Sequence, residues 1–146
     1  DQTSKVYIKQ YLHEGEDLYF DSSKDFNPVL KLGQEQASLA ICADINQVDH
    51  PYQAKRKASS IYLPCFFYSE NGIAEGHQKL QYYAEKWSMN ILMSNYNGQH
   101  WGIQSGGRSA FWDTKGNLLG NLNANDSGVL IAEKTNENWK TKALTF

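Results

Sequence analysis

The sequence contains no apolar run that approaches the length of about 20 residues that spans a bilayer. No secretory signal is recognisable, and the longest basic stretch is Lys55-Arg56-Lys57. The formal net charge is only −2. The chain therefore lacks the basic patch with which nucleic-acid-binding proteins hold phosphate groups. These absences argue against a membrane or a nucleic acid as a partner.

Cysteine is also scarce. Cys42 and Cys65 are the two cysteines of the chain, and neither has the spacing of a metal site. Two cysteines without such a pattern favour a reducing compartment over a disulfide scaffold, so we expect a cytoplasmic protein. We expect no metal ion and no cofactor, and we interpret Cys65 as a packing residue.

Short apolar segments alternate with helix-forming segments, which predicts an α/β fold. Leu80, Tyr83, Ala84 and Trp87 repeat at helical spacing and predict a helix over residues 76–88. We expect a second helix over residues 47–60, and a polar tail from residue 135 that is loose or folds over a neighbour. The expected strands cover residues 5–12, 28–32, 39–41, 61–63 with Pro64 as their end, 90–94, 108–113, 118–122 and 129–133.

The stretch with the most chemical information is residues 38–44, Ser-Leu-Ala-Ile-Cys-Ala-Asp. Its apolar part is too short for a helix and fits a buried strand. Cys42 therefore lies where a strand ends and a helix is about to begin. The amide N–H groups of such a turn and a nearby helix N-terminus favour the thiolate, the nucleophilic form of cysteine. Taken alone, without its neighbours in the sequence, Cys42 would be interpreted as a buried structural cysteine.

Three separated segments form a recognisable set. The first segment is Tyr7-Ile8-Lys9-Gln10-Tyr11-Leu12, followed by Glu16. The second, which contains the cysteine, is Leu39-Ala40-Ile41-Cys42-Ala43-Asp44-Ile45. The third is Met93-Ser94-Asn95, followed by Gly106-Gly107-Arg108-Ser109-Ala110-Phe111-Trp112 and Gly116. In this order they resemble the lysine motif, the nucleophile motif and the C-terminal strands of the carbon–nitrogen hydrolase family, also called the nitrilase superfamily. The resemblance covers nearly the whole chain.

The resemblance implies a four-layer α-β-β-α sandwich, of which residues 1–146 would form the C-terminal half as a single, N-terminally truncated domain. Family members are much longer, and their general-base glutamate lies before this part. The sequence begins Asp1-Gln2-Thr3, without an initiator Met, so we expect a fragment, a processed chain or a deliberate truncation. Half of a sandwich exposes an apolar sheet face or a strand edge. We therefore expect a homo-oligomer, or association with the missing N-terminal half.

The resemblance also implies the chemistry. Cys42 would attack an amide, carbamoyl or nitrile carbon of a small molecule and form a thioester. Lys9 and the backbone N–H of Ala43 would stabilise the oxyanion, and Glu16 would orient the lysine. The expected function is hydrolysis of a non-peptide C–N bond by the full-length parent, with this chain alone inactive or weak. The sequence does not select a substrate.

We expect the substrate pocket along Phe66, Asn95, Trp101 and Arg108. Phe66 ends a segment that lines the pocket in the family, and residues 95–106 form a loop rich in Gly and Asn, of a kind that often carries binding groups. Arg108 follows two glycines. It either binds an acidic group of the substrate or pairs with a surface carboxylate.

Other interpretations stay open at this point. Without the resemblance, Lys9 is a solvated strand lysine and Glu16 is one of a run of loop acids. Asp44 either shares the face of Cys42 or, as we expect, caps the following helix. A binding or assembly module of the same fold would lack the chemistry altogether. A cysteine–histidine hydrolase would pair the cysteine with His13, His50, His77 or His100.

Overall fold

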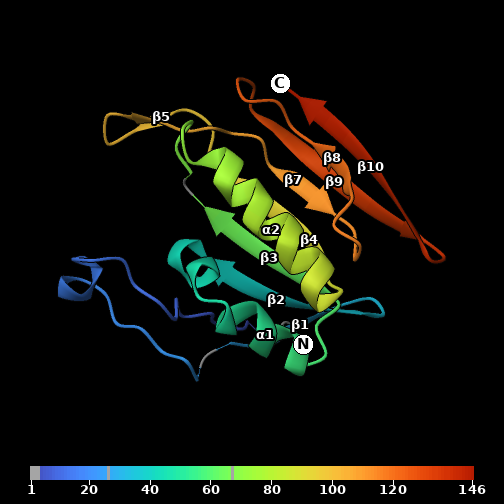
Figure 1. Ribbon diagram of the computed structural model, residues 1–146, viewed down its shortest axis with the longest axis horizontal. Coiled ribbons are helices and arrows are strands. Elements are labelled where there is room, and N and C mark those ends of the chain that lie inside the picture. The colour runs from blue at the N-terminus through green and yellow to red at the C-terminus, as the bar shows by residue number, and fades with distance from the viewer. Residues whose placement is uncertain (1–3, 26, 67) are drawn as a thin grey trace.

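The computed structural model describes residues 4–25, 27–66 and 68–146. Its largest element is a six-stranded sheet with strand order β1-β2-β3-β4-β7-β8 (Figure 1). The three middle strands, β2, β3 and β4, run parallel, and the pairs β1–β2, β4–β7 and β7–β8 are antiparallel. The strands of this sheet are β1 (Val29–Leu32), β2 (Glu35–Ile41), β3 (Ile61–Phe66), β4 (Asn90–Asn95), β7 (Ala110–Trp112) and β8 (Leu118–Asn121). The predicted α/β architecture is confirmed.

Two helices cover one face of this sheet, α1 (Asp49–Arg56) and α2 (Ile73–Trp87) (Figure 1). The apolar stripe predicted for the second helix is buried, since Leu80 and Ala84 are both 0% exposed. These side chains share one core cluster with Tyr62 of β3. The helix begins three residues earlier than the apolar stripe predicted, whereas α1 is shorter than the predicted residues 47–60.

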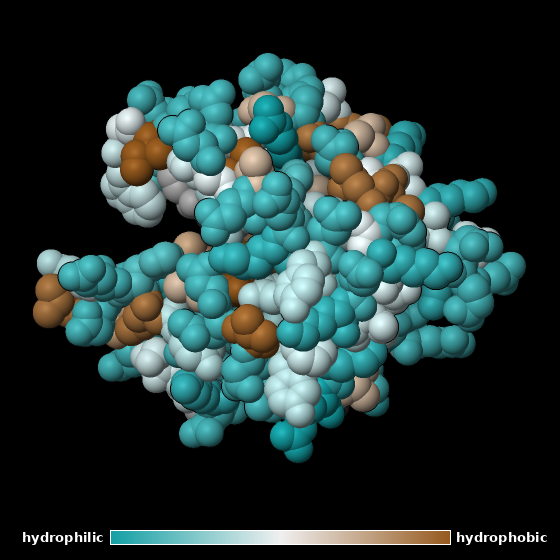
Figure 2. Space-filling model, in the orientation of Figure 1, coloured by the Kyte–Doolittle hydropathy of each residue, from teal (hydrophilic) through white to brown (hydrophobic). Residues whose placement is uncertain are grey.

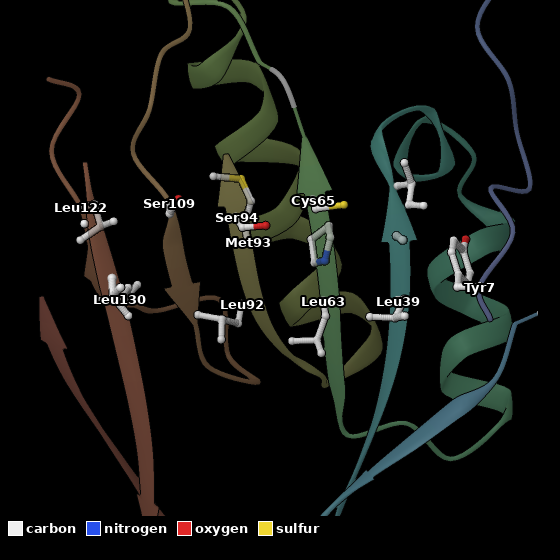
Figure 3. Close-up of a pocket in the computed structure, with 15 residues that line it drawn as sticks. Tyr7, Leu39, Leu63, Cys65, Leu92, Met93, Ser94, Ser109, Leu122 and Leu130 are labelled. Atoms are coloured by element: carbon white, nitrogen blue, oxygen red, sulfur yellow. The ribbon is translucent and has the colours of Figure 1, made fainter. Parts of the chain in front are cut away.

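The opposite face of the sheet carries a row of leucines. Successive residues of a strand point to opposite faces, so Leu39, Leu63 and Leu92 lie on the side away from the helices, next to one another on β2, β3 and β4 (Figure 3). Each of the three is partly exposed. One face of the sheet is therefore a finished core, and the other is apolar but open.

A hairpin of β9 (Gly128–Thr135) and β10 (Asn138–Thr145) folds against part of this second face. The ring of Trp139 lies 5.1 Å from that of Phe111 on β7. Lys134 Nζ lies 2.5 Å from Glu35 Oε1 at the start of β2. The polar tail expected from residue 135 is therefore an ordered strand, because every residue of β10 has a partner on β9.

The prediction of a strand over residues 5–12 is wrong. Residues 4–12 contain no strand, because two of their amide groups have a different partner. The N–H groups of Gln10 and Tyr11 donate to Asp44 Oδ1, both at 2.9 Å. A buried carboxylate thus replaces the neighbouring strand that an extended segment would need.

The prediction that Pro64 ends its strand is also wrong. β3 continues to Phe66 in the middle of the sheet. The β3–β4 ladder has partners at Tyr62↔Ile91 and again at Cys65↔Ser94, with none at Pro64. The strand therefore passes the residue that has no N–H by interrupting one ladder there.

The surface seen in Figure 2 is mostly hydrophilic, with apolar residues in small separate patches. Within residues 4–25, 27–66 and 68–146, no helix combines the length and the apolar character needed to cross a membrane.

Replacing Leu80 by Ala tests the core under α2. The side chain is fully buried, so its truncation leaves a cavity, and we expect the free energy of unfolding to fall by about 2–5 kcal/mol. The exposed neighbour, in Gln81→Ala, is the matched control and should change it by less than about 0.5 kcal/mol. Urea denaturation followed by circular dichroism measures both. Equal effects of the two substitutions would contradict the described packing of α2.

Candidate active site

Three of the predicted site residues lie at one edge of the sheet. Cys42 directly follows β2, Phe66 ends β3, and Asn95 ends β4. The parallel register pairs Ile41 with Cys65 and Phe66 with Asn95, so the three strands end at the same level. The carboxyl ends of parallel strands are where α/β proteins usually bind ligands.

Cys42 occupies the sharp bend that the sequence predicted between a strand and a helical segment. It is the first residue of the 3-10 turn η2 (Cys42–Asn46), and its φ is 47°. A non-glycine residue in this left-handed region costs of order 1–3 kcal/mol and persists only where the surroundings impose it. Here Ala43 and Ile45, which follow in the same turn, are buried. The half-buried thiol packs beside the core cluster.

Lys9 is not a solvated lysine. Its Nζ lies 2.5 Å from Glu16 Oε2, and the two side chains are 14% and 32% exposed. The hydrogen bond from Lys9 is the largest of the effects that lower the pKa of Glu16 below its ordinary value. Glu16 is therefore ionised at neutral pH, and the two side chains form a true ion pair.

Asp44 ties the lysine segment to the cysteine turn. Its carboxylate is fully buried and accepts hydrogen bonds from the backbone N–H groups of Gln10, Tyr11 and Ile41, at 2.9, 2.9 and 2.8 Å. A fourth bond comes from Tyr7 Oη at 2.5 Å. Asp44 caps the 3-10 turn η2 that it belongs to, because its carboxylate accepts the N–H of the N-cap residue Ile41, whereas the next helix, α1, has no side-chain cap. The carboxylate instead holds the neighbours of Lys9 beside the residue that precedes Cys42.

The network continues below Asp44 through two more buried side chains. Tyr7 Oη lies 2.9 Å from His50 Nε2, and His50 Nδ1 lies 2.7 Å from Tyr62 Oη. Burial is the main cause that lowers the pKa of His50 and raises the pKa of both tyrosines. The ring and the two hydroxyls are therefore neutral at pH 7.

His13 is the histidine in contact with the cysteine. His13 Nε2 lies 3.2 Å from Cys42 Sγ, and the two residues are 29 positions apart in the sequence, which is why no local pattern pointed to this pair. His50 belongs to the buried network, and His77 Nε2 lies 3.0 Å from a backbone oxygen of Arg108. Within the described residues, no group of three or more His, Cys, Asp and Glu side chains could hold a metal ion.

No family model matches the sequence, and no curated protein matches it. Solved structures do match. A structure of the amidase from Nesterenkonia sp. AN1 has a TM-score of 0.73 and 22% identity, over 85% of this chain and 48% of that chain. A mutant of this amidase with a covalent acetamide moiety at its active-site cysteine has a TM-score of 0.72 and 22% identity, over 82% of this chain and 45% of that chain. The glutamine-dependent NAD+ synthetase from Acinetobacter baumannii has a TM-score of 0.79 and 19% identity, over 94% of this chain and 27% of that chain.

The chain has the nitrilase-superfamily fold. The predicted fold class is thereby confirmed, and it is partial, because the chain spans about half the length of the amidase structures that it matches. These neighbours are amidases and a synthetase, and the mutant amidase shows that the cysteine of that enzyme forms a covalent adduct.

Asn95 and Arg108 lie together at a pocket of about 320 Å³ beside the site edge of the nitrilase-like fold. The Asn95 side chain accepts a hydrogen bond from the N–H of Tyr68 and donates one to the backbone oxygen of Gly107, both at 2.8 Å. Arg108 is exposed, with a left-handed φ of 55°. Asn95 thus shapes the pocket through the two loops that it binds, while the side chain of Arg108 stands at its rim.

Phe66 and Trp101 occupy different surroundings. Phe66 is only 9% exposed and packs with its ring centroid 4.8 Å from that of Tyr68. Trp101 lies between the short strands β5 (Gln99–His100) and β6 (Ile103–Gln104), is 78% exposed, and has its ring 4.2 Å from that of His100. Phe66 can therefore form only the floor of a pocket, whereas Trp101 lies on a projecting hairpin.

A larger groove of about 510 Å³ lies between the open sheet face and β9. Figure 3 shows it with Leu63 and Leu92 on its floor and Leu130 on its far wall. Cys65, labelled in Figure 3, lines this groove and is exposed rather than packed in the core. The protein around it limits its hydration, and this burial is the main cause that raises the pKa of the Cys65 thiol. The two cysteines of the chain thus have different surroundings.

Replacing Asp44 by Asn tests the link between the two motif segments. In either orientation an Asn amide leaves donors facing its NH2 group, so we expect the free energy of unfolding to fall by about 2–3 kcal/mol. The amide protons of Gln10 and Tyr11 should exchange faster with deuterium, since they donate to this carboxylate. Hydrogen exchange followed by NMR measures this. Asp21 has an exposed carboxylate, so Asp21→Asn is the control. Identical exchange rates of the Gln10 and Tyr11 amide protons in both variants would contradict the role of Asp44.

Proposed function

We propose that Cys42 is the nucleophile of a carbon–nitrogen hydrolase that cleaves a non-peptide C–N bond in a small amide, carbamoyl compound or nitrile. The observation that carries this proposal is the cysteine on a strained strand-to-helix bend, tied through Asp44 to a Lys9–Glu16 ion pair. The structural likeness to amidases with a reactive cysteine supports it. The family resemblance of the sequence motifs supports the same roles for these residues.

In the proposed reaction on an amide, the Cys42 thiolate attacks the carbonyl carbon, the C–N bond breaks as the departing ammonia or amine takes up a proton, and water then hydrolyses the thioester. On a nitrile, the thiolate adds to the carbon, the nitrogen takes up a proton, and water then releases ammonia and the acid. Lys9 and the backbone N–H of Ala43 stabilise the negative charge that develops on the attacked group. One such donor is typically worth about 3–4 kcal/mol of barrier. Glu16 fixes the direction of the lysine ammonium through its 2.5 Å contact.

The proposed activity belongs to the whole protein. The chain corresponds to 45–48% of the amidase structures, and the family likeness assigns the general-base glutamate to the part before it. General acid–base help contributes about 10²–10⁴-fold, so the 146 residues alone should acylate slowly at best. We propose that the open sheet face is covered by this remaining part or by a second copy of the chain.

Asn95, Trp101, Arg108 and Phe66 are the proposed substrate-binding residues. Asn95 and Arg108 support this role because they share a pocket, with Arg108 positioned to bind an acidic substrate group.

The test is release of ammonia or amine by the native protein, isolated from its source, from a panel of aliphatic amides, carbamoylated amines and nitriles. Cys42→Ala should abolish the release, and Lys9→Ala should lower kcat by about 10²–10³-fold because an oxyanion donor is lost. The exposed lysine of β1, in Lys31→Ala, is the matched control and should keep kcat within about twofold. Full release by Cys42→Ala would refute the proposal.

A non-catalytic binding or assembly module is the second candidate. Its support is that Glu16 already accepts hydrogen bonds from Lys9 and from the backbone N–H of His13, so this carboxylate is a poor candidate for a general base. A native polypeptide no larger than the 16.6 kDa of this chain would put this candidate first.

The two candidates predict different reactivity of the two cysteines. If Cys42 is activated, iodoacetamide should alkylate it at least about tenfold faster than Cys65 at pH 7, and the ratio should shrink in Lys9→Met. Mass spectrometry of the digested protein measures both sites in one sample, so Cys65 is an internal control. Slow and equal labelling of the two thiols would favour the module.

A further inference from the structure

We propose that His13 takes up the proton of the Cys42 thiol, so that the resting site holds a thiolate beside an imidazolium. The proposal rests on the function proposed above and deepens it, because it assigns activation of the nucleophile to a group inside this chain. The starting point is the distance of 3.2 Å between His13 Nε2 and Cys42 Sγ. In the transfer the S–H bond breaks, an N–H bond forms at Nε2, and the electron pair stays on sulfur.

The backbone of His13 is fixed by its own turn. Its N–H donates to Glu16 Oε2 at 2.8 Å, and the N–H of Glu16 donates back to the His13 backbone oxygen at 3.1 Å. Gly15 permits this tight turn with a φ of 84°, a conformation that glycine adopts without a steric penalty. Lys9 donates to the same oxygen, Glu16 Oε2. The imidazole therefore reaches the cysteine from an anchored loop.

The proposed proton transfer would give both groups neighbours of opposite charge. In water a thiol with a pKa of about 8.5 does not protonate an imidazole with a pKa of about 6.5, and the equilibrium is unfavourable by about a hundredfold. After the transfer, Lys9 would be positive, Glu16 negative, the His13 ring positive and the Cys42 thiolate negative. Each charged group in this series would then lie next to one of opposite sign. The amide groups of the turn that begins at Cys42 add further support for the thiolate.

The other titratable groups near the pair do not compete for the proton. Cys65 and Tyr68 face Cys42 from β3 and the loop that follows it, and burial raises the pKa of both, that of Tyr68 to about 12. Both are therefore neutral at pH 7. Glu14, on the same turn as His13, is exposed, and its charge would favour the imidazolium.

The experiment measures the alkylation rate of Cys42 by iodoacetamide between pH 5 and pH 10, in the chain with Cys65→Ser so that one thiol remains. An ordinary thiol is only about 1% thiolate at pH 6.5, while a thiolate of lower basicity is also a weaker nucleophile. We therefore expect His13→Gln to slow alkylation about tenfold at pH 6.5 and to restore a single rise above pH 8. The exposed histidine of the β5–β6 hairpin, in His100→Gln, is the matched control and should leave the rate profile unchanged.

A second measurement needs no substitution at the histidine. The ring nitrogen shifts of His13 in 15N NMR should be those of an imidazolium at pH 7, and Cys42→Ser should return them to those of a neutral ring. A neutral ring at pH 7 beside an intact Cys42, or a rate profile that His13→Gln leaves unchanged, would overturn the proposal. Loss of the fast alkylation in Lys9→Met but not in His13→Gln would assign the activation to the lysine instead.

These outcomes are independent of the proposed hydrolase activity. If the native protein releases no ammonia or amine but the thiolate depends on His13, the proposed function fails and the proton assignment stands. If the native protein is a hydrolase and its thiol is indifferent to His13→Gln, the proton assignment fails alone.

Discussion

The site depends on one buried carboxylate. Removing the Asp44 charge from water is costly, and the cost is offset only while its four donors are in place. Those donors come from a segment up to 37 positions earlier in the sequence and from the end of β2. Neither the lysine segment nor the cysteine turn can shift alone without leaving that charge short of a partner. The carboxylate therefore fixes Lys9 relative to Cys42 without itself reaching the thiol.

Around this support, the strained backbone and the charged side chains belong to different residues. The left-handed backbone of Cys42 is a local cost, which the buried residues after it hold in place. Lys9 and His13 lie on a loop and Glu16 begins a short 3-10 turn over residues 16–18, and their order follows from direct contacts between charged groups and backbone amides. The ends of β2, β3 and β4 form the edge at which the site lies. Asp44 fixes the lysine segment relative to the cysteine turn, and the segment before η2 carries the charged side chains.

Local patterns sufficed where the partners lay close in sequence. The stripe around Leu80 predicted α2, and the short apolar run before Cys42 predicted the bend. Residues 5–12 were misassigned because the backbone N–H of Gln10 donates to the side chain of Asp44, 34 positions later in the sequence, and not to a neighbouring strand. β10 was missed because its eight residues are mostly polar and exposed, so no alternation marked it. The contact between His13 and Cys42 depends on tertiary structure alone, whereas Lys9, Glu16 and Cys42 were named from a family resemblance.

The contact between Lys134 and Glu35 joins residues 99 positions apart, and it has a consequence for the order of folding. Closing so long a loop costs chain entropy before the contact contributes anything. During synthesis, the first strands leave the ribosome long before β9 is translated. The start of β2 and the open sheet face with Leu39, Leu63 and Leu92 are therefore not covered by the hairpin during that time. Until the last hairpin is translated, the part of that face which the hairpin covers in the folded chain is also accessible to a chaperone or to a neighbouring nascent chain.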